Sequence, residues 1–132
     1  MEERITTAGI LIDGGRVLVG KRINEGAIGG RWEFPGGKNR WGETLGDTIS
    51  REWDEELGVS VHMVKELTGH DFVNKETLYH LRALLIESDS TDFELRMHDE
   101  LRFVGSEEIM TLDFAPSDEA VRDWLISEGY IK

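Results

Sequence analysis

The chain has 132 residues, of which 27 are acidic and 15 are basic, so its formal net charge is −12. A protein this acidic repels a phosphate backbone, and we therefore expect no long nucleic acid among its partners. Cysteine is absent, which excludes disulfides, thiolate metal sites and cysteine nucleophiles and is typical of a reducing compartment.

The length is that of one compact domain, so we expect a single domain over residues 1–132. The opening residues Met1–Arg4 lack the basic-then-apolar pattern of a signal peptide. No apolar run approaches the roughly 18 residues needed to span a bilayer. These features predict a cytoplasmic protein that makes no membrane contact. We expect a monomer or a homodimer.

The first elements predicted along the chain form a hairpin. Runs rich in β-forming residues cover 5–12 and 16–21, and Asp13-Gly14-Gly15 separates them. Asp-Gly between two apolar runs is a strong signal for a tight turn between antiparallel strands. We therefore expect the chain to open with two antiparallel strands.

A loop and a helix are predicted next. A glycine-rich stretch from Gly26 to Gly30 precedes a short strand at 31–34, which ends at Pro35-Gly36-Gly37 because proline and glycine disfavour regular pairing. Residues 44–57 are rich in helix formers, and Gly58 is a suitable residue to end the helix. Its apolar residues recur every fourth position: Leu45, Ile49, Trp53 and Leu57. This spacing predicts one buried side.

The second half of the chain predicts three more strands and two helical segments. The strands cover 59–64, 77–86 and 101–104, and a polar loop covers 87–92. A helical turn at 106–110 and a terminal helix at 117–128 follow, and we expect the terminal helix to bury Ala120, Val121, Trp124 and Leu125. The whole pattern predicts a mixed sheet with helices on its faces.

Three carboxylates gather on one side of the predicted helix. At 100° per residue, Glu52, Glu55 and Glu56 fall within an arc of roughly 100°. Such a cluster is tolerable when hard divalent cations neutralise it, and Mg²⁺ prefers carboxylate oxygens together with water and phosphate oxygens. The pattern predicts a Mg²⁺ site; the alternative is a solvated acidic helix face.

Residues 37–59, GKNRWGETLGDTISREWDEELGV, resemble the Nudix box. That motif is Gly, five residues, Glu, seven residues, Arg-Glu, an apolar residue, any residue, Glu-Glu, any residue, Gly and an apolar residue. The matching positions are Gly37, Glu43, Arg51, Glu52, Glu55, Glu56, Gly58 and Val59. So many specified positions are far more specific than a lone glycine motif. Trp53 departs from the pattern, since an aliphatic residue is usual there.

The resemblance implies an α+β fold, an α/β/α sandwich with a mixed β-sheet and the box helix. It also implies a Nudix pyrophosphohydrolase that uses Mg²⁺, with Mn²⁺ as a possible substitute. The implied metal ligands are the carbonyl of Gly36 and the carboxylates of Glu52, Glu55 and Glu56, with Glu56 also polarising the attacking water. Some members use a glutamate from a distant loop instead, and Glu100 stands where that catalytic and metal-binding residue is expected.

Arg51 lies about 100° around the helix from Glu52, so we expect it to pair with a carboxylate rather than to touch phosphate. The resemblance implies that Arg51 orients a glutamate of the box, either Glu43 or Glu55. The alternative is an ordinary pair with Glu55 one helical turn away.

The run before the box, GRWEFPGGK at 30–38, resembles the MutT branch of the family. Its members hydrolyse oxidised or other non-standard nucleoside triphosphates, such as 8-oxo-dGTP, to monophosphate and pyrophosphate. Residues 113–118 resemble the segment of that branch that carries a base-reading Asn or Asp. The resulting candidates for substrate binding are Arg22, Phe34, Gly37, Lys38, His80 and Asp118.

Asp118 carries the prediction of base preference. An ionised aspartate only accepts hydrogen bonds, so it suits a guanine-type edge first and cytosine second. The alternative is a helix-terminus role, in which Ser117 caps the last helix and Asp118 lies in its first turn.

Other readings of the family resemblance stay open. Hydrolases of ADP-ribose typically carry a proline beyond the box, whereas the prolines here are Pro35 and Pro116. Hydrolases of dinucleoside polyphosphates usually place a tyrosine in that region, and Tyr79 lies too far downstream. A non-catalytic nucleotide-sensing domain is a further alternative, although such domains commonly lose box glutamates and this chain keeps them all.

Overall fold

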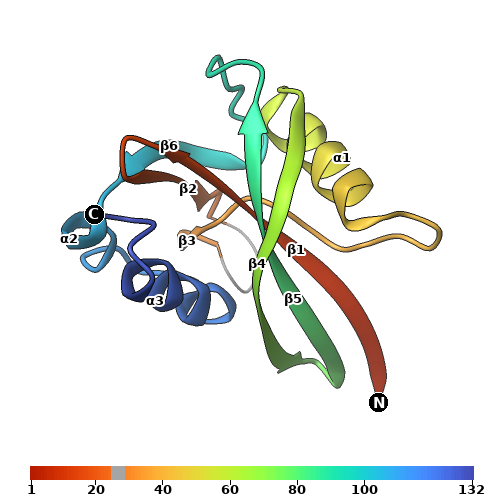
Figure 1. The fold of residues 1–132 in the computed structure, drawn as a ribbon. Coiled ribbons are helices and arrows are strands. Elements are labelled where there is room, and N and C mark those ends of the chain that lie inside the picture. Colours follow the sequence, from red (N-terminus) through yellow and green to blue (C-terminus); the bar gives the residue numbers. More distant parts are fainter. Residues whose placement is uncertain (25–28) are drawn as a thin grey trace.

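A computed structural model of the chain describes residues 1–24 and 29–132 (Figure 1). The strands are β1 (Glu2–Asp13), β2 (Arg16–Arg22), β3 (Trp32–Glu33), β4 (Val61–Asn74), β5 (Thr77–Ser88) and β6 (His98–Val104). The helices are α1 (Leu45–Leu57), α2 (Ser106–Ile109), the 3-10 helix η1 (Pro116–Asp118) and α3 (Glu119–Ser127). Most of the predicted glycine-rich stretch lies outside the described residues.

The strands form one mixed sheet in the order β3-β2-β1-β5-β4, with β6 paired to β2. β1 and β5 run parallel, with Ala8 opposite Ala83, and the other pairs are antiparallel. The predicted hairpin is confirmed, since Asp13 pairs with Arg16 across Gly14 and Gly15. Both glycines have positive φ angles, 59° and 78°, which suit a turn that residues with a side chain rarely adopt.

Helices cover the sheet on opposite sides, with α1 on one side and α2 and α3 on the other (Figure 1). The predicted helix is confirmed, because it ends at Gly58 with φ 65°. It begins with a capping box in which the Thr44 hydroxyl accepts from the backbone N–H of Asp47. The mixed sheet between helical layers confirms the expected α/β/α sandwich.

Trp53, the departure from the box pattern, is completely buried beneath the sheet. Its indole Nε1 donates a 2.9 Å hydrogen bond to the carbonyl oxygen of Pro35. Gly9 on β1 makes room for the ring, since a Cβ atom at Gly9 would lie 2.4 Å from Nε1. The large side chain therefore fits without disturbing the box, and it ties α1 to the loop at 35–37.

The terminal helix starts later than predicted. Residues Pro116–Asp118 form a 3-10 turn, and the Ser117 hydroxyl bonds to Asp118 rather than capping α3. Val121 and Leu125 are buried as expected, but Ala120 is exposed and Arg122 is buried in its place. Arg122 packs its guanidinium 5.6 Å over the Phe114 ring, an interaction that the apolar spacing of the helix does not reveal.

β4 runs well beyond the predicted 59–64. It is an edge strand whose side chains are mostly exposed, and its pairing with β5 shifts register twice. Bulges and an exposed face remove the strict alternation of apolar and polar residues, so the sequence pattern hides the strand. No helix of the described chain is long and apolar enough to cross a bilayer.

Candidate active site

A cavity of about 600 Å³ opens beside the start of β1 and brings together distant parts of the chain. Its lining glutamates are Glu33, Glu52, Glu55 and Glu56, and its basic residues are Arg4, Arg22, Lys38 and Arg40. Phe34, Phe72, Leu81 and Asp118 line it as well. The same cavity can therefore hold cations, phosphates and an aromatic ring.

The loop at 35–39 borders the cavity by running antiparallel to β1. The backbone N–H groups of Thr7 and Gly9 donate to the carbonyls of Gly37 and Pro35, both at 2.8 Å. A Cβ atom at Gly36 would lie 2.1 Å from the Thr7 carbonyl oxygen, and one at Gly37 would lie 2.4 Å from the Glu52 carboxylate carbon. Only glycine allows the loop to pass this close to both β1 and the acidic face of α1.

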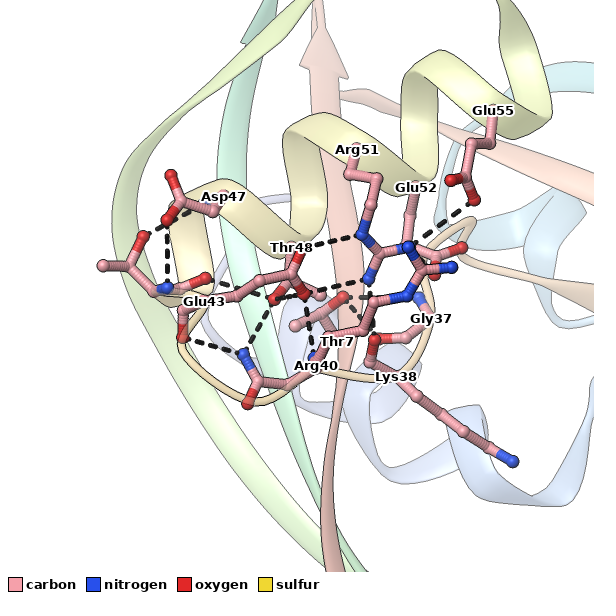
Figure 2. Close-up of polar contacts among 12 residues, drawn as sticks. Thr7, Gly37, Lys38, Arg40, Glu43, Asp47, Thr48, Arg51, Glu52 and Glu55 are labelled. Atoms are coloured by element: carbon pink, nitrogen blue, oxygen red, sulfur yellow. Dashed lines mark hydrogen bonds and ion pairs between the residues drawn. The ribbon is translucent and has the colours of Figure 1, made fainter.

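Arg51 is the centre of a dense hydrogen-bond network between this loop and α1 (Figure 2). It holds Glu43 through two bonds of 2.7 and 3.0 Å and Glu52 through one of 2.7 Å. It also donates to the carbonyl oxygen of Lys38 at 3.0 Å, whereas its contact with Glu55 is 3.5 Å. The hydrogen bond from Arg51 lowers the pKa of Glu43 to about 2. The expected pairing with Glu43 is confirmed, and Glu52 is an additional partner.

Glu56 has weaker partners than Glu43 and Glu52 have in Arg51. Burial raises its pKa to about 9, and the neighbouring carboxylates of Glu33 and Glu52 act in the same direction. Its Oε1 atom is buried without a hydrogen-bond partner, and the nearest cationic group is the Arg22 guanidinium at 3.5 Å. A buried carboxylate left in this state favours the arrival of a positively charged ligand.

Glu33 and His98 belong to the same cluster, although no role was predicted for either residue. The Nε2 atom of His98 lies 3.0 Å from the Glu33 carboxylate, and both side chains are buried. One signal was available for Glu33, since a glutamate between Trp32 and Phe34 on a buried strand has to find a partner. His98 gave no such signal, because its partners lie on other elements at no fixed spacing.

Asp118 lies at another wall of the cavity, beside Phe34. Its carboxylate accepts from the backbone N–H of Phe34 at 2.9 Å and from the Ser117 hydroxyl at 3.0 Å. Burial and the nearby Glu33 raise the pKa of Asp118 to about 7. Asp118 lies at the helix terminus, in the first turn of η1 and at the N-cap position of α3, as the alternative has it, but its side chain makes no capping hydrogen bond. At neutral pH this carboxyl group is present in both charged and neutral forms.

The structure corrects the placement of two candidate residues, His80 and Glu100. Successive strand residues point to opposite faces, so Leu81 lines the cavity whereas His80 bonds to Glu3 and Asp71, each at 2.9 Å. The hydrogen bond to Glu3, followed by that to Asp71, raises the pKa of His80. Glu100 is held by Arg102 and does not line the cavity. From this part of the chain it is Met97, directly before β6, that lines the cavity.

The basic residues of the cavity are less engaged than Arg51. Within residues 1–24 and 29–132, Arg4 has a single ion pair, with Glu2 at 4.0 Å, and the Lys38 ammonium lies 5.5 Å over the Tyr79 ring. Lys38 pairs with Thr6 across the loop and β1, and Arg40 follows two residues later along the same edge. These cations are accordingly available to an anionic ligand.

Comparison with known proteins agrees with this geometry. The sequence profile of the NUDIX domain matches residues 3–125. A Mycobacterium tuberculosis protein with the provisional name 8-oxo-dGTP diphosphatase 2 is 35% identical over 127 residues, covering 95% of this chain and 87% of that protein. The CTP pyrophosphohydrolase of Escherichia coli is 27% identical, covering 84% and 82%. The MutT protein of Methanosarcina mazei shares the fold with a TM-score of 0.82 at 22% identity, covering 96% and 92%.

Proposed function

This chain belongs to the NUDIX family and is a hydrolase of acid anhydrides, and we propose that it cleaves a nucleoside triphosphate to nucleoside monophosphate and pyrophosphate with Mg²⁺. The observation that carries the proposal is the composition of one cavity. Carboxylates for metal, cations for phosphates and a buried carboxyl group for a base edge all line it.

The residues present fit a divalent cation. Glu56 has a buried oxygen without a hydrogen-bond partner, and Glu52 is packed against Gly37 so closely that no Cβ atom would fit between them. Glu52, Glu55, Glu56 and the carbonyl of Gly36 would hold Mg²⁺, for which Mn²⁺ is a possible substitute. When bound, the ion neutralises phosphate charge and lowers the pKa of a bound water.

The protein's own side chains supply the other functions that the reaction needs. Glu56 polarises the attacking water, because its buried Oε1 atom has no hydrogen-bond partner among the described residues and is free to act on it. Arg51 is a positioning residue, since it fixes Glu52 and the loop at Lys38 without reaching a phosphate. Arg22, Lys38 and Arg40 bind phosphate oxygens by charge-assisted hydrogen bonds.

The base stacks near Phe34 and meets Asp118. The backbone N–H of Phe34 already holds Asp118 in place, so the carboxyl group is preorganised. A carboxyl group with a pKa near 7 can also donate a hydrogen bond in its neutral form, which widens the acceptor-only role expected from the sequence. We place 8-oxo-guanine nucleotides first and cytosine nucleotides second, an order that the names of the mycobacterial and E. coli relatives support.

A hydrolysis screen tests the proposal. Normal and damaged nucleoside triphosphates, ADP-ribose and a dinucleoside polyphosphate are each incubated with and without Mg²⁺, and pyrophosphate and phosphate are detected separately. We expect pyrophosphate from triphosphates only with Mg²⁺, and fastest from 8-oxo-dGTP. Cleavage confined to ADP-ribose or the dinucleotide would contradict the proposed substrate class, and no cleavage at all would favour a sensing domain.

A further inference from the structure

A second group of possible metal ligands adjoins the box glutamates. Glu33 on β3, Glu56 on α1 and His98 at the start of β6 each offer one ligand atom, and the three atoms lie within 4.8 Å of one another. All three residues are buried, with exposed fractions of 9%, 5% and 2%. Two carboxylates and an imidazole thus converge from three separate elements.

The neutralisation of this cluster is incomplete. The Arg22 guanidinium approaches Glu33 and Glu56 only to 3.7 and 3.5 Å, distances too long for strong hydrogen bonds. Glu56 Oε1 and His98 Nδ1 are both buried without a hydrogen-bond partner in the described part of the chain. Because buried charged oxygens are costly unless they are paired, the cluster lacks a cation that contacts both carboxylates directly.

The neighbouring strand is shaped to admit the imidazole. A Cβ atom at Gly20 on β2 would lie 2.5 Å from His98 Cδ2, so any other residue there would displace the ring. The pairing of β2 with β6 also shifts register between Lys21 and Arg22, which brings Arg22 opposite His98. The glycine and the bulge together hold His98 and Arg22 beside the two carboxylates.

We propose that Glu33, Glu56 and His98 form a binding site for a divalent first-row transition ion, next to the Mg²⁺ site and sharing Glu56 with it. An ion about 2.1 Å from each ligand keeps any two ligand atoms within about 4.2 Å, so the cluster needs to contract by less than about 1 Å. The ion takes over from Arg22 the neutralisation of both carboxylates. Arg22 is then released toward the phosphate-binding side of the cavity.

The ligand set determines which ion the site prefers. Mg²⁺ selects oxygen ligands and gives up its water reluctantly, whereas imidazole suits transition ions. The site therefore discriminates by His98, and it binds metal whether or not the chain hydrolyses a nucleotide.

Mn²⁺ titrations followed by electron paramagnetic resonance test the site. Free Mn²⁺ is measured in excess Mg²⁺ for the unmodified protein, for His98→Gln and for His80→Gln. The amide of His98→Gln can still donate to Glu33, so the fold is retained while the imidazole is lost. His80→Gln is the matched control, because His80 also lies between two carboxylates but on an exposed strand face.

We expect the unmodified protein and His80→Gln to retain one Mn²⁺ that Mg²⁺ does not displace. His98→Gln is expected to bind it at least about tenfold more weakly, the usual scale for a lost metal-site interaction. Equal Mn²⁺ binding by the unmodified protein and His98→Gln would overturn the proposal. Since the titration contains no nucleotide, its outcome is independent of the hydrolysis screen.

A measurement on the unmodified protein removes any dependence on the folding of a variant. In the presence of Mg²⁺, substoichiometric Mn²⁺ is added while the ring signals of the four histidines are followed by nuclear magnetic resonance. The His98 signals are expected to broaden before those of His62, His70 and His80, because a paramagnetic ion affects the nearest nuclei first. Sharp His98 signals beside broadened signals of the others would exclude the site.

Discussion

Arg51 and Arg22 both lie among glutamates at the acidic face of α1, yet they hold their partners in opposite ways. Arg51 makes bonds of 2.7 to 3.0 Å to Glu43, Glu52 and a loop carbonyl. Arg22 comes no closer than 3.5 Å to Glu56 and 3.7 Å to Glu33. Arg51 thus completes a hydrogen-bonded framework. Arg22 leaves the buried carboxylates of Glu33 and Glu56 only partly neutralised, so a ligand can bind there.

The carboxylates record the same difference. Arg51 lowers the pKa of Glu43 to about 2, so that carboxylate is ionised at neutral pH. Burial raises the pKa of Glu56 to about 9. Two glutamates of one motif therefore have opposite preferences for a proton, and the difference comes from the partners that the fold gives them.

The largest expected difference between the Arg51 network and the carboxylates beside Arg22 comes from replacing Glu43 or Glu56 by glutamine. We expect Glu56→Gln to lower kcat at least about a hundredfold, the scale of a lost proton acceptor, while the melting temperature without metal stays the same or rises. Glu43→Gln is expected to lower the melting temperature, since it removes a charged partner of Arg51. The measurements are kcat at saturating Mg²⁺ and thermal melts of both variants.

The contrast between Glu56 and Glu43 would be wrong if each variant behaved as we expect of the other. Near-normal turnover of Glu56→Gln with unchanged Mg²⁺ demand would remove Glu56 from the mechanism. An unchanged melting temperature for Glu43→Gln would show that the Arg51 network does not stabilise the fold.

Asp118 is, like Glu56, a buried acidic group of the cavity with a raised pKa, and it is the group proposed to read the base. Asp118→Ala would leave base donors unpaired in the cavity, at a cost on the order of 1 to 3 kcal/mol, so we expect kcat/KM to fall by roughly five- to 150-fold for the preferred bases. The rates are measured on 8-oxo-dGTP, dGTP, dCTP and dTTP, beside the melting temperature. An equal fall for all four substrates would make Asp118 a structural residue.

The sequence predicted the Arg51 network better than the contacts of Glu33 and His98, for physical reasons. The Arg51 network lies within a single local motif, where helix geometry relates Arg51 to its neighbours and the box supplies Glu43. The Glu33 and His98 contacts join three elements that are far apart in the chain, and no local period encodes them. His80 was misplaced for a related reason, because the face of a strand depends on the parity of its pairing register.

Arg40 provides a milder test of the unpaired cations. It lines the cavity and has no ion pair within the described residues, so Arg40→Gln is expected to raise KM for triphosphates about three- to tenfold and leave kcat nearly unchanged. Arg16→Gln, on an exposed part of the β1–β2 hairpin, is the matched control for net charge. If both variants raise KM equally, the effect is one of overall charge and Arg40 makes no direct contact.

Metal removal should change stability mainly through Glu56, the proposed Mg²⁺ ligand that Arg51 does not hold. Mg²⁺ relieves repulsion among the helix carboxylates, and a ligand at about ten times its Kd stabilises the native state by about 1.4 kcal/mol. We expect millimolar Mg²⁺ to raise the melting temperature by a few degrees relative to chelator, with Glu43→Gln retaining the gain and Glu56→Gln losing most of it. Superimposable melts of the unmodified protein with and without metal would contradict this expectation.

The smallest expected effect is the pH dependence of the Arg51 network. The pKa of Glu43 in the folded chain is about 2, below its ordinary value of 4.5, so the folded state favours the ionised carboxylate. The stability that Glu43 contributes is thus fully present above pH 4.5 and is lost as the pH falls from 4.5 toward 2. A carboxylate with a raised pKa, such as Glu56, has the opposite dependence, because its cost grows as the pH rises above its ordinary value.

The difference in melting temperature between the unmodified protein and Glu43→Gln isolates this contribution, since the other titrating groups are common to both and cancel. We expect the difference to be constant between about pH 5 and pH 8 and to shrink steadily below pH 4.5. A difference that stays constant down to pH 3 would mean that Glu43 is held by shape rather than by charge. A difference that already disappears by pH 6 would mean that Arg51 does not hold Glu43 in solution. Arg51 and Arg22 would then not differ in how tightly they bind their carboxylate partners.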